Sequence, residues 1–315
     1  MEAQELLTQL MSIPPQTGDK TKLDSESIKK LLEKRAVSDK KREKSISQFI
    51  DKYDFETERK SIDGIIKTTT IIPKYININN KNKIIIYIHG GAYTIGTSDN
   101  SLGISVPSAQ FSQMKVISVN YRLAPEDPFP AALNDCLAIY QELINQYSPK
   151  NIGILGDSAG GSLALATLLK AQDMGLPMPG AVVLLSPWAD ITKTGETYYT
   201  LNGLDPVISD YKILEDSAKA YTNGLDMKNP LISPIYGEYK LGFPPTLIQS
   251  GTRDLFLSLC VRLYRKLQNA GIDVKLSLWE GMWHVFQAFP NIPEGKEAFQ
   301  ELGKFFIEKL SASPN

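Results

Sequence analysis

The chain has 315 residues, of which 42% are hydrophobic and 22% charged, as in ordinary soluble globular proteins. A chain of this length can bury a core without help from disulfides or a structural metal. Its net charge of −1 argues against nucleic acid or an anionic membrane surface as a partner. The two cysteines, Cys136 and Cys260, lie far apart, which argues against a disulfide framework and a cysteine-based zinc site.

The N-terminus has no basic segment followed by an apolar run, so we expect no signal peptide. No stretch approaches the roughly 18 uninterrupted apolar residues of a membrane-spanning helix. These features predict a cytoplasmic protein. Residues 1–55 are rich in Lys, Glu, Ser and Gln, with apolar residues at helical spacing. Acidic residues interleave with the basic ones, which favours one or two solvated amphipathic helices over a basic recruitment patch.

From about residue 62, short apolar runs alternate with helical patterns. The predicted strands are Ile84–Ile88, Val116–Val119, Ile152–Leu155, Ala181–Leu185, Thr246–Gln249 and Val274–Trp279. The predicted helices are Ala131–Gln146, Ser162–Ala171, Leu257–Ala270 and Pro293–Leu310. Continuously apolar strands separated by helices indicate a mostly parallel sheet with both faces covered, an α/β fold. The stretch at about 195–225 breaks the alternation and is predicted to be an insertion.

A candidate nucleophile, Ser158, lies in a G-x-S-x-G pattern, Gly156-Asp157-Ser158-Ala159-Gly160. The pattern alone is weak, but here it follows an apolar strand and precedes a helix, the context that this motif requires. A tight strand-to-helix turn strains the serine backbone and directs the first N–H groups of the helix toward the serine oxygen. We therefore predict that Ser158 is a catalytic nucleophile.

A serine nucleophile needs a general base, and histidine suits that task near neutral pH. The sequence has only two histidines, His89 and His284. In hydrolases with this motif the chain order is nucleophile, acid, histidine, which only His284 satisfies. The scarcity of histidine also leaves a histidine-rich metal site without residues, so we expect no catalytic metal.

The acidic partner should lie between Ser158 and His284, after a strand. Asp254 satisfies both conditions, because it follows the predicted strand Thr246–Gln249. Its role would be to orient the imidazole and stabilise the imidazolium. The alternatives in the same interval are Asp190, Asp205, Asp226 and Glu280, and Asp190 also follows a strand.

His89-Gly90-Gly91-Ala92 follows the strand at Ile84–Ile88 and looks like an HGGG-type oxyanion loop. In such loops main-chain N–H groups bind the oxyanion, and glycines allow the substrate oxygen a close approach. We predict donors at Gly90, Gly91 and Ala159. His89 itself is interpreted as orienting the loop rather than as a catalyst.

These motifs together resemble the hormone-sensitive-lipase-like family of esterases in the α/β-hydrolase superfamily. The matching segments are His89-Gly90-Gly91, Tyr121–Glu126, Pro128–Ala131, Gly156–Gly161, Ser186-Pro187-Trp188, Gly251–Asp254 and His284-Val285-Phe286. The resemblance implies an α/β-hydrolase fold: a mostly parallel eight-stranded sheet flanked by helices, with a helical cap. In this reading residues 1–55 contribute helices to the cap, and residues 56–315 form the catalytic domain with the cap insertion at about 195–225.

The resemblance also implies a serine carboxylesterase for esters of short- to medium-chain acids, working without a cofactor. Ala92 stands where a third glycine is commonest, which would narrow the space beside the oxyanion. Arg122 and Glu126 are expected to tie their loop together. The alternatives are a lactone, amide or carbamate hydrolase with the same triad, or a non-catalytic ligand-binding hydrolase fold. Similar proteins dimerise through the edge strand and last helix, so a homodimer is a hypothesis here.

Overall fold

The computed structural model describes residues 23–62, 64, 66–209, 211–289 and 292–310 of the chain. In these residues it forms one eight-stranded sheet in the order β1-β2-β4-β3-β5-β6-β7-β8. Only β2 runs against its neighbours, and the pairs from β4 to β8 are all parallel. The strands are β1 (Phe55–Ile62), β2 (Ile66–Pro73), β3 (Ile84–Ile88), β4 (Lys115–Asn120), β5 (Ile152–Asp157), β6 (Ala181–Leu185), β7 (Thr246–Gly251) and β8 (Val274–Trp279). The predicted fold, a mostly parallel eight-stranded sheet, is confirmed.

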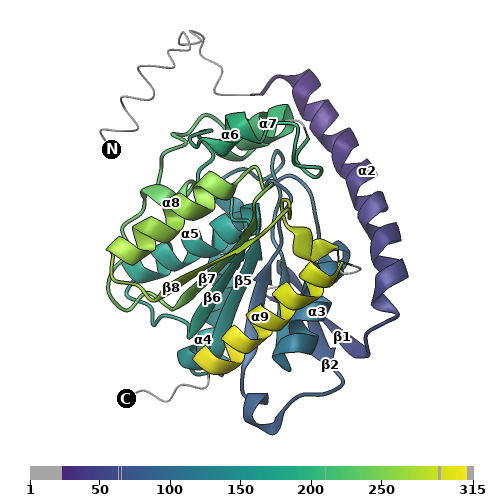
Figure 1. Cartoon of the computed structure of the whole chain (residues 1–315), viewed down its shortest axis with the longest axis vertical. Helices are drawn as coiled ribbons and strands as arrows, with labels where there is room; N and C mark the ends of the chain where they lie inside the picture. Colours follow the sequence, from purple (N-terminus) through teal and green to yellow (C-terminus); the bar gives the residue numbers. More distant parts are fainter. Residues whose placement is uncertain (1–22, 63, 65, 210, 290–291, 311–315) are drawn as a thin grey trace.

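Helices cover both faces of this sheet, as Figure 1 shows. They are α2 (Ser25–Ile50), α3 (Leu102–Ser112), α4 (Ala131–Gln146), α5 (Ala159–Asp173), α6 (Thr197–Thr200), α7 (Tyr211–Thr222), α8 (Leu257–Asn269) and α9 (Pro293–Lys309). The helices α4, α5 and α8 lie on one face, and α3 and α9 lie on the other. Within the described residues, no helix has both the length and the apolar character needed to cross a bilayer.

Strand β3 shows why the central strands are apolar at every position. Ile84, Ile86 and Ile88 point into the core that contains α4, α5 and α8, whereas Ile85 and Tyr87 point into the core under α3 and α9. Successive side chains of a strand face opposite sides of the sheet, so burial on both sides leaves no polar position. This central position holds the end of β3 beside the end of β5, where the two predicted site loops begin.

Two segments lie outside the sheet layers. Figure 1 shows α6 and α7 above the carboxyl end of the sheet, with the long helix α2 running down one flank. Arg35 of α2 donates from Nε to the carbonyl of Thr94 (2.6 Å) and forms a two-pronged pair with the Glu126 carboxylate (2.7 and 2.8 Å). Helix α2 is therefore attached to the loops that follow β3 and β4, close to the predicted oxyanion loop.

Candidate active site

The nucleophile candidate Ser158 occupies a sharp turn between β5 and α5. Its backbone has φ 52° and ψ −122°, a conformation that non-glycine residues seldom adopt. The surrounding main chain holds it: the Ser158 N–H donates to the Leu185 carbonyl (2.8 Å), and the Trp188 N–H donates to the Ser158 carbonyl (3.0 Å). The turn therefore has the strain that the sequence motif predicts.

Close packing explains the glycine that follows the serine by two residues. A Cβ on Gly160 would lie 2.1 Å from the carbonyl oxygen of Ile88 and 2.4 Å from that of His89. No other residue fits there without moving the end of β3. The glycine thus brings the nucleophile turn and the His89 loop into direct contact, as a shared oxyanion site requires.

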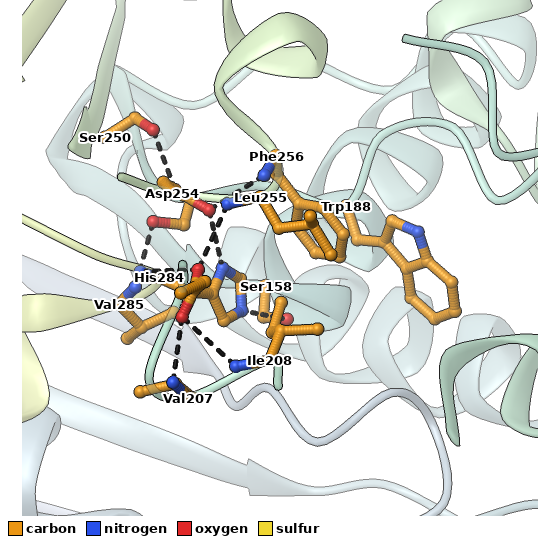
Figure 2. A network of polar contacts seen from close by, with 12 residues as sticks. Ser158, Trp188, Val207, Ile208, Ser250, Asp254, Leu255, Phe256, His284 and Val285 are labelled. Atoms are coloured by element: carbon orange, nitrogen blue, oxygen red, sulfur yellow. Dashed lines mark hydrogen bonds and ion pairs between the residues drawn. The ribbon is translucent and has the colours of Figure 1, made fainter. Parts of the chain in front are cut away.

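His284 lies beside Ser158 in a loop after β8. Its Nε2 is 2.9 Å from Ser158 Oγ, and its Nδ1 is 3.1 Å from Asp254 Oδ1. The Asp254 carboxylate can only accept, so Nδ1–H donates to it and Nε2 is left to accept from the serine hydroxyl. Figure 2 shows these three residues in one line of hydrogen bonds. All three are nearly buried, with exposed fractions of 9% for Ser158, 4% for His284 and 0% for Asp254.

The Asp254 carboxylate is fixed by donors on both oxygens. Ser250 donates its hydroxyl to Oδ2 (2.7 Å), and the Phe256 N–H donates to Oδ1 (2.9 Å), the oxygen that also faces His284. The Phe256 ring packs edge-on against the imidazole, with ring centroids 4.7 Å apart. Donors and ring together leave the imidazole little freedom to rotate away from Ser158.

The site's charges set the direction of each pKa shift. Burial lowers the pKa of His284, but the Asp254 charge and hydrogen bond, with smaller effects from Asp205 and Asp157, outweigh burial and raise it. Burial raises the pKa of Asp254, yet the His284 charge and the hydrogen bonds to the carboxylate lower it overall. Asp254 thus stays ionised at neutral pH, and His284 has the greater basicity of the two.

The other acidic candidates have different surroundings. Asp190 is buried against Arg262 (2.9 Å) and accepts from the Tyr236 hydroxyl (3.1 Å), an arrangement that ties α8 to the loop after β6. Asp226 accepts from the Lys228 N–H in an exposed turn. Asp205 accepts from the main-chain N–H of His284 rather than from its ring. Asp254 is the carboxylate that faces the imidazole.

The oxyanion loop differs from expectation at Gly90. Its N–H donates to Asp157 Oδ1 (2.8 Å), and the Tyr87 hydroxyl donates to the same oxygen (2.8 Å). The register of β3 on β5 pairs Ile88 with Gly156, which brings the next residue, Asp157, beside the start of the loop. The prediction that Gly90 is an oxyanion donor is therefore wrong in this structure, because Asp157 already uses its N–H.

Three neighbouring N–H groups are uncommitted. Among the hydrogen bonds of the described residues, none is donated by the main chain of Gly91, Ala92 or Ala159. Gly91 and Ala92 have positive φ angles of 121° and 52°, and Tyr93 continues the run at 64°. Such a run strains non-glycine residues and is typical of functional loops. Sequence reasoning missed Ala92, because the motif suggested only its glycines.

His89 and the loop after β4 have structural contacts. The His89 ring stacks on Tyr121 with centroids 4.3 Å apart, and the Tyr121 hydroxyl donates to the His89 carbonyl (2.8 Å). Arg122 pairs with Asp135 of α4 (2.7 Å) and, at 3.8 Å, with Asp127 of its own loop, whereas Glu126 pairs with Arg35 of α2. Both residues thus hold this loop, mainly by tying it to neighbouring helices.

The chain is similar in sequence to known proteins. A family model described as alpha/beta hydrolase fold matches residues 85–288. The chain is 35% identical to an acetyl-hydrolase from Streptomyces hygroscopicus over 71% of its own length and 75% of the relative's. It is also 35% identical to an esterase from Acinetobacter venetianus, over 71% and 74% of the two chains.

Solved structures agree with the sequence comparisons. The crystal structure of esterase E25 is 30% identical, covers 97% of this chain and 94% of its own, and has a TM-score of 0.86. An esterase from the bacterial hormone-sensitive lipase family is also 30% identical, covers 98% and 97%, and has a TM-score of 0.81. The resemblance drawn from the motifs is thereby confirmed: the chain belongs to the α/β-hydrolase fold family, among the esterases that are similar to hormone-sensitive lipase.

Proposed function

We propose that this protein is a serine carboxylesterase in which Ser158 is the nucleophile, His284 the general base and Asp254 its orienting acid. One observation supports this most strongly: the unbroken hydrogen-bond chain from Ser158 Oγ through the imidazole to Asp254. Among the relatives are an acetyl-hydrolase and several esterases, which favours an ester bond as the target. Nothing in the geometry favours a lactone or amide over an ester.

The reaction would run in two acyl-transfer steps. Ser158 Oγ attacks the ester carbonyl while His284 Nε2 takes its proton, and the Asp254 charge stabilises the imidazolium that forms. The imidazolium then gives its proton to the leaving alcohol, and the acyl group remains on Ser158. Water deprotonated by His284 attacks this acyl-enzyme, releases the carboxylic acid and restores the serine.

The tetrahedral oxyanion of both steps would bind to main-chain donors. We assign Gly91 and Ala159, as the sequence suggests, and Ala92 in place of Gly90. Ala159 is the first residue of α5, so its N–H has no acceptor within the helix and lies at the positive end of the helix dipole. The Ala92 methyl group would narrow the space on one side of the oxyanion, which favours small leaving alcohols.

The side of the site formed by the rings of Trp188 and Phe256 favours short acyl chains. Trp188 stacks on Phe256 with centroids 5.8 Å apart, and Phe256 in turn contacts the imidazole. Both side chains are fully buried, so a long acyl chain on that side would have to displace them. A relative from Pseudomonas putida, 30% identical, is an ethyl acetate hydrolase. Of the two predicted cap segments, 1–55 and about 195–225, the described residues from 23 onward would form a cap over this site, and residues 1–22 lie outside the described part of the chain.

A homodimer and a cytoplasmic location stay predictions.

A panel of p-nitrophenyl esters tests this function. We expect kcat/KM to be highest for acetate to octanoate and at least about tenfold lower for palmitate, because added methylenes must find room among buried rings. Lactone and anilide substrates in the same assay separate the ester from its alternatives. A fluorophosphonate probe should label Ser158 covalently and abolish turnover. An unlabelled protein without turnover of any ester would refute the proposal.

The raised pKa of His284 predicts the pH dependence of this activity. The base must be neutral to accept the serine proton, so activity is lost as pH falls through that pKa. The acid limb of kcat/KM should therefore follow a single ionisation with a midpoint above 6.5, the ordinary value for histidine. Initial rates in constant-ionic-strength buffers measure the midpoint. A midpoint well below 6.5 would show that His284 is not the group that titrates, or that its carboxylate neighbours do not act on it.

A further inference from the structure

One buried carboxylate near the site is not used by the mechanism above. Asp205 lies between α6 and α7, in the segment that covers the carboxyl end of the sheet, and only 1% of it is exposed. Within the described residues it accepts four hydrogen bonds, and all of them come from main-chain N–H groups. Four donors in place of a cationic partner satisfy both carboxylate oxygens and keep the negative charge stable in a buried position.

The two oxygens of Asp205 hold different parts of the chain. Oδ1 accepts from Val207 (2.8 Å) and Ile208 (3.1 Å) in the same loop, an arrangement that aspartate before proline commonly forms at a turn. Oδ2 accepts from Leu255 (3.0 Å) and His284 (3.2 Å), 50 and 79 residues further along the chain. Figure 2 shows the N–H groups of these four residues converging beside the imidazole.

The two hydrogen bonds to Asp205 Oδ2 come from the main chain of the loops that carry the triad. One comes from the main chain of His284 itself, and the other comes from Leu255, the residue directly after Asp254. A single oxygen therefore sets the spacing between the loops that carry the base and the acid. Displacements of about 1 Å in such groups can cost about a hundredfold in rate, so the length of this bridge matters for catalysis.

We propose that Asp205 is a positioning residue for the triad, a carboxylate carried by the covering segment that fixes the main chain of His284 and Leu255 and thereby couples the seating of that segment to triad alignment. The proposal rests on the proposed esterase function. A purely structural role would consist of the Oδ1 turn alone, which affects the stability of the loop and leaves the chemistry of correctly folded molecules unchanged.

The charge of Asp205 gives a second effect that a turn-forming residue would lack. The ionised groups that act on His284 are Asp254, Asp205 and Asp157, and each raises the pKa of the imidazole against the opposing effect of burial. Removing one negative charge lowers that pKa. Since the neutral imidazole is the active form, the acid limb of kcat/KM should then move to lower pH.

The test is Asp205→Asn, which keeps the shape but turns one acceptor oxygen into an N–H₂ group that faces two main-chain donors. Active sites are counted with the fluorophosphonate probe, so that rates refer to correctly folded molecules. Per site, we expect kcat to fall by about ten- to a hundredfold, with the acid limb moved to lower pH. Asp190→Asn is the matched control: it removes an equally buried carboxylate and should lower the melting temperature while per-site kcat and the acid limb stay as in the wild type.

Both changes in Asp205→Asn, and neither in Asp190→Asn, support the proposal; any other pattern overturns it. If Asp205→Asn does not fold, Asp205→Glu keeps the charge and moves the oxygens by one methylene. A per-site kcat at least about tenfold lower with an unmoved acid limb supports the proposal, and a smaller loss or a moved limb overturns it. A wild-type protein that hydrolyses no ester refutes the esterase itself, whereas an active wild type matched by its Asp205 variants refutes only this inference.

Discussion

Ser158→Ala should lower kcat for p-nitrophenyl butyrate by about six orders of magnitude, the loss measured for the nucleophile of other serine hydrolases. Without the hydroxyl no acyl-enzyme can form, and His284 has no proton to take. Residual rate enhancement would come only from substrate binding and the oxyanion donors, at about 10³- to 10⁴-fold over water. Stopped assays at high enzyme concentration, with active sites of the wild type counted by probe labelling, measure the difference.

The control for this loss is another buried serine. Ser108 lies on α3, which covers the face of the sheet opposite to α5, the helix that follows Ser158. The Ser108 hydroxyl donates to the Ile104 carbonyl within the helix. Ser108→Ala should keep kcat within about twofold, because it removes one helix hydrogen bond worth about 1 kcal/mol and touches nothing in the site. A folded Ser158→Ala protein that retains more than about a thousandth of wild-type activity would contradict the assignment.

The central sheet could be predicted because its sequence signal is strong. The runs from Ile84 to Ile88 and from Ala181 to Leu185 are apolar at every position, and the structure buries them on both faces. Strand β1 gives no such signal. Its residues Phe55–Ile62 are mostly charged or polar and almost all exposed, as suits a strand at the sheet edge, where charges discourage pairing with another chain.

The sequence did not predict helix α3, because most of its residues are buried, whereas those of β1 are exposed. It is buried almost all round, contains Pro107, and has serines whose hydroxyls donate back to carbonyls of the preceding turn. Periodicity detects a helix by contrast between an apolar and a polar face, and this helix has no polar face. Its packing against α9 depends on segments almost 200 residues apart, which no local pattern records.

In the site, the sequence located residues whose roles follow from a motif or from scarcity. Ser158 has its five-residue pattern, and His284 is the one histidine in the required order. Gly90 and Asp205 depend instead on contacts between distant segments. The Gly90 N–H reaches Asp157 through the register of two strands, and Asp205 reaches His284 across 79 residues. Such contacts arise only when the chain is folded.

Asp254→Asn should lower kcat by about 10⁴-fold while leaving the fold in place, about a hundredfold less than the loss expected for Ser158→Ala. The asparagine amide presents an N–H₂ group where Nδ1–H now donates, so the imidazole adopts the other tautomer with its proton on Nε2. That nitrogen then donates toward Ser158 and cannot accept its proton. The pKa of His284 should also fall, because the Asp254 charge, which raises this pKa more than any other group does, is gone.

Asp190→Asn makes this prediction decisive, because Asp190 also follows a strand and is also completely buried. Its carboxylate accepts from Thr192, Arg262 and Tyr236, so the change leaves the Arg262 charge without its carboxylate and should lower thermal stability. Per-site kcat should stay as in the wild type, since none of the hydrogen bonds of Asp190 to described residues reaches the imidazole. The reverse outcome, a large loss of kcat in Asp190→Asn and little in Asp254→Asn, would move the acid of the triad from the end of β7 to the loop after β6.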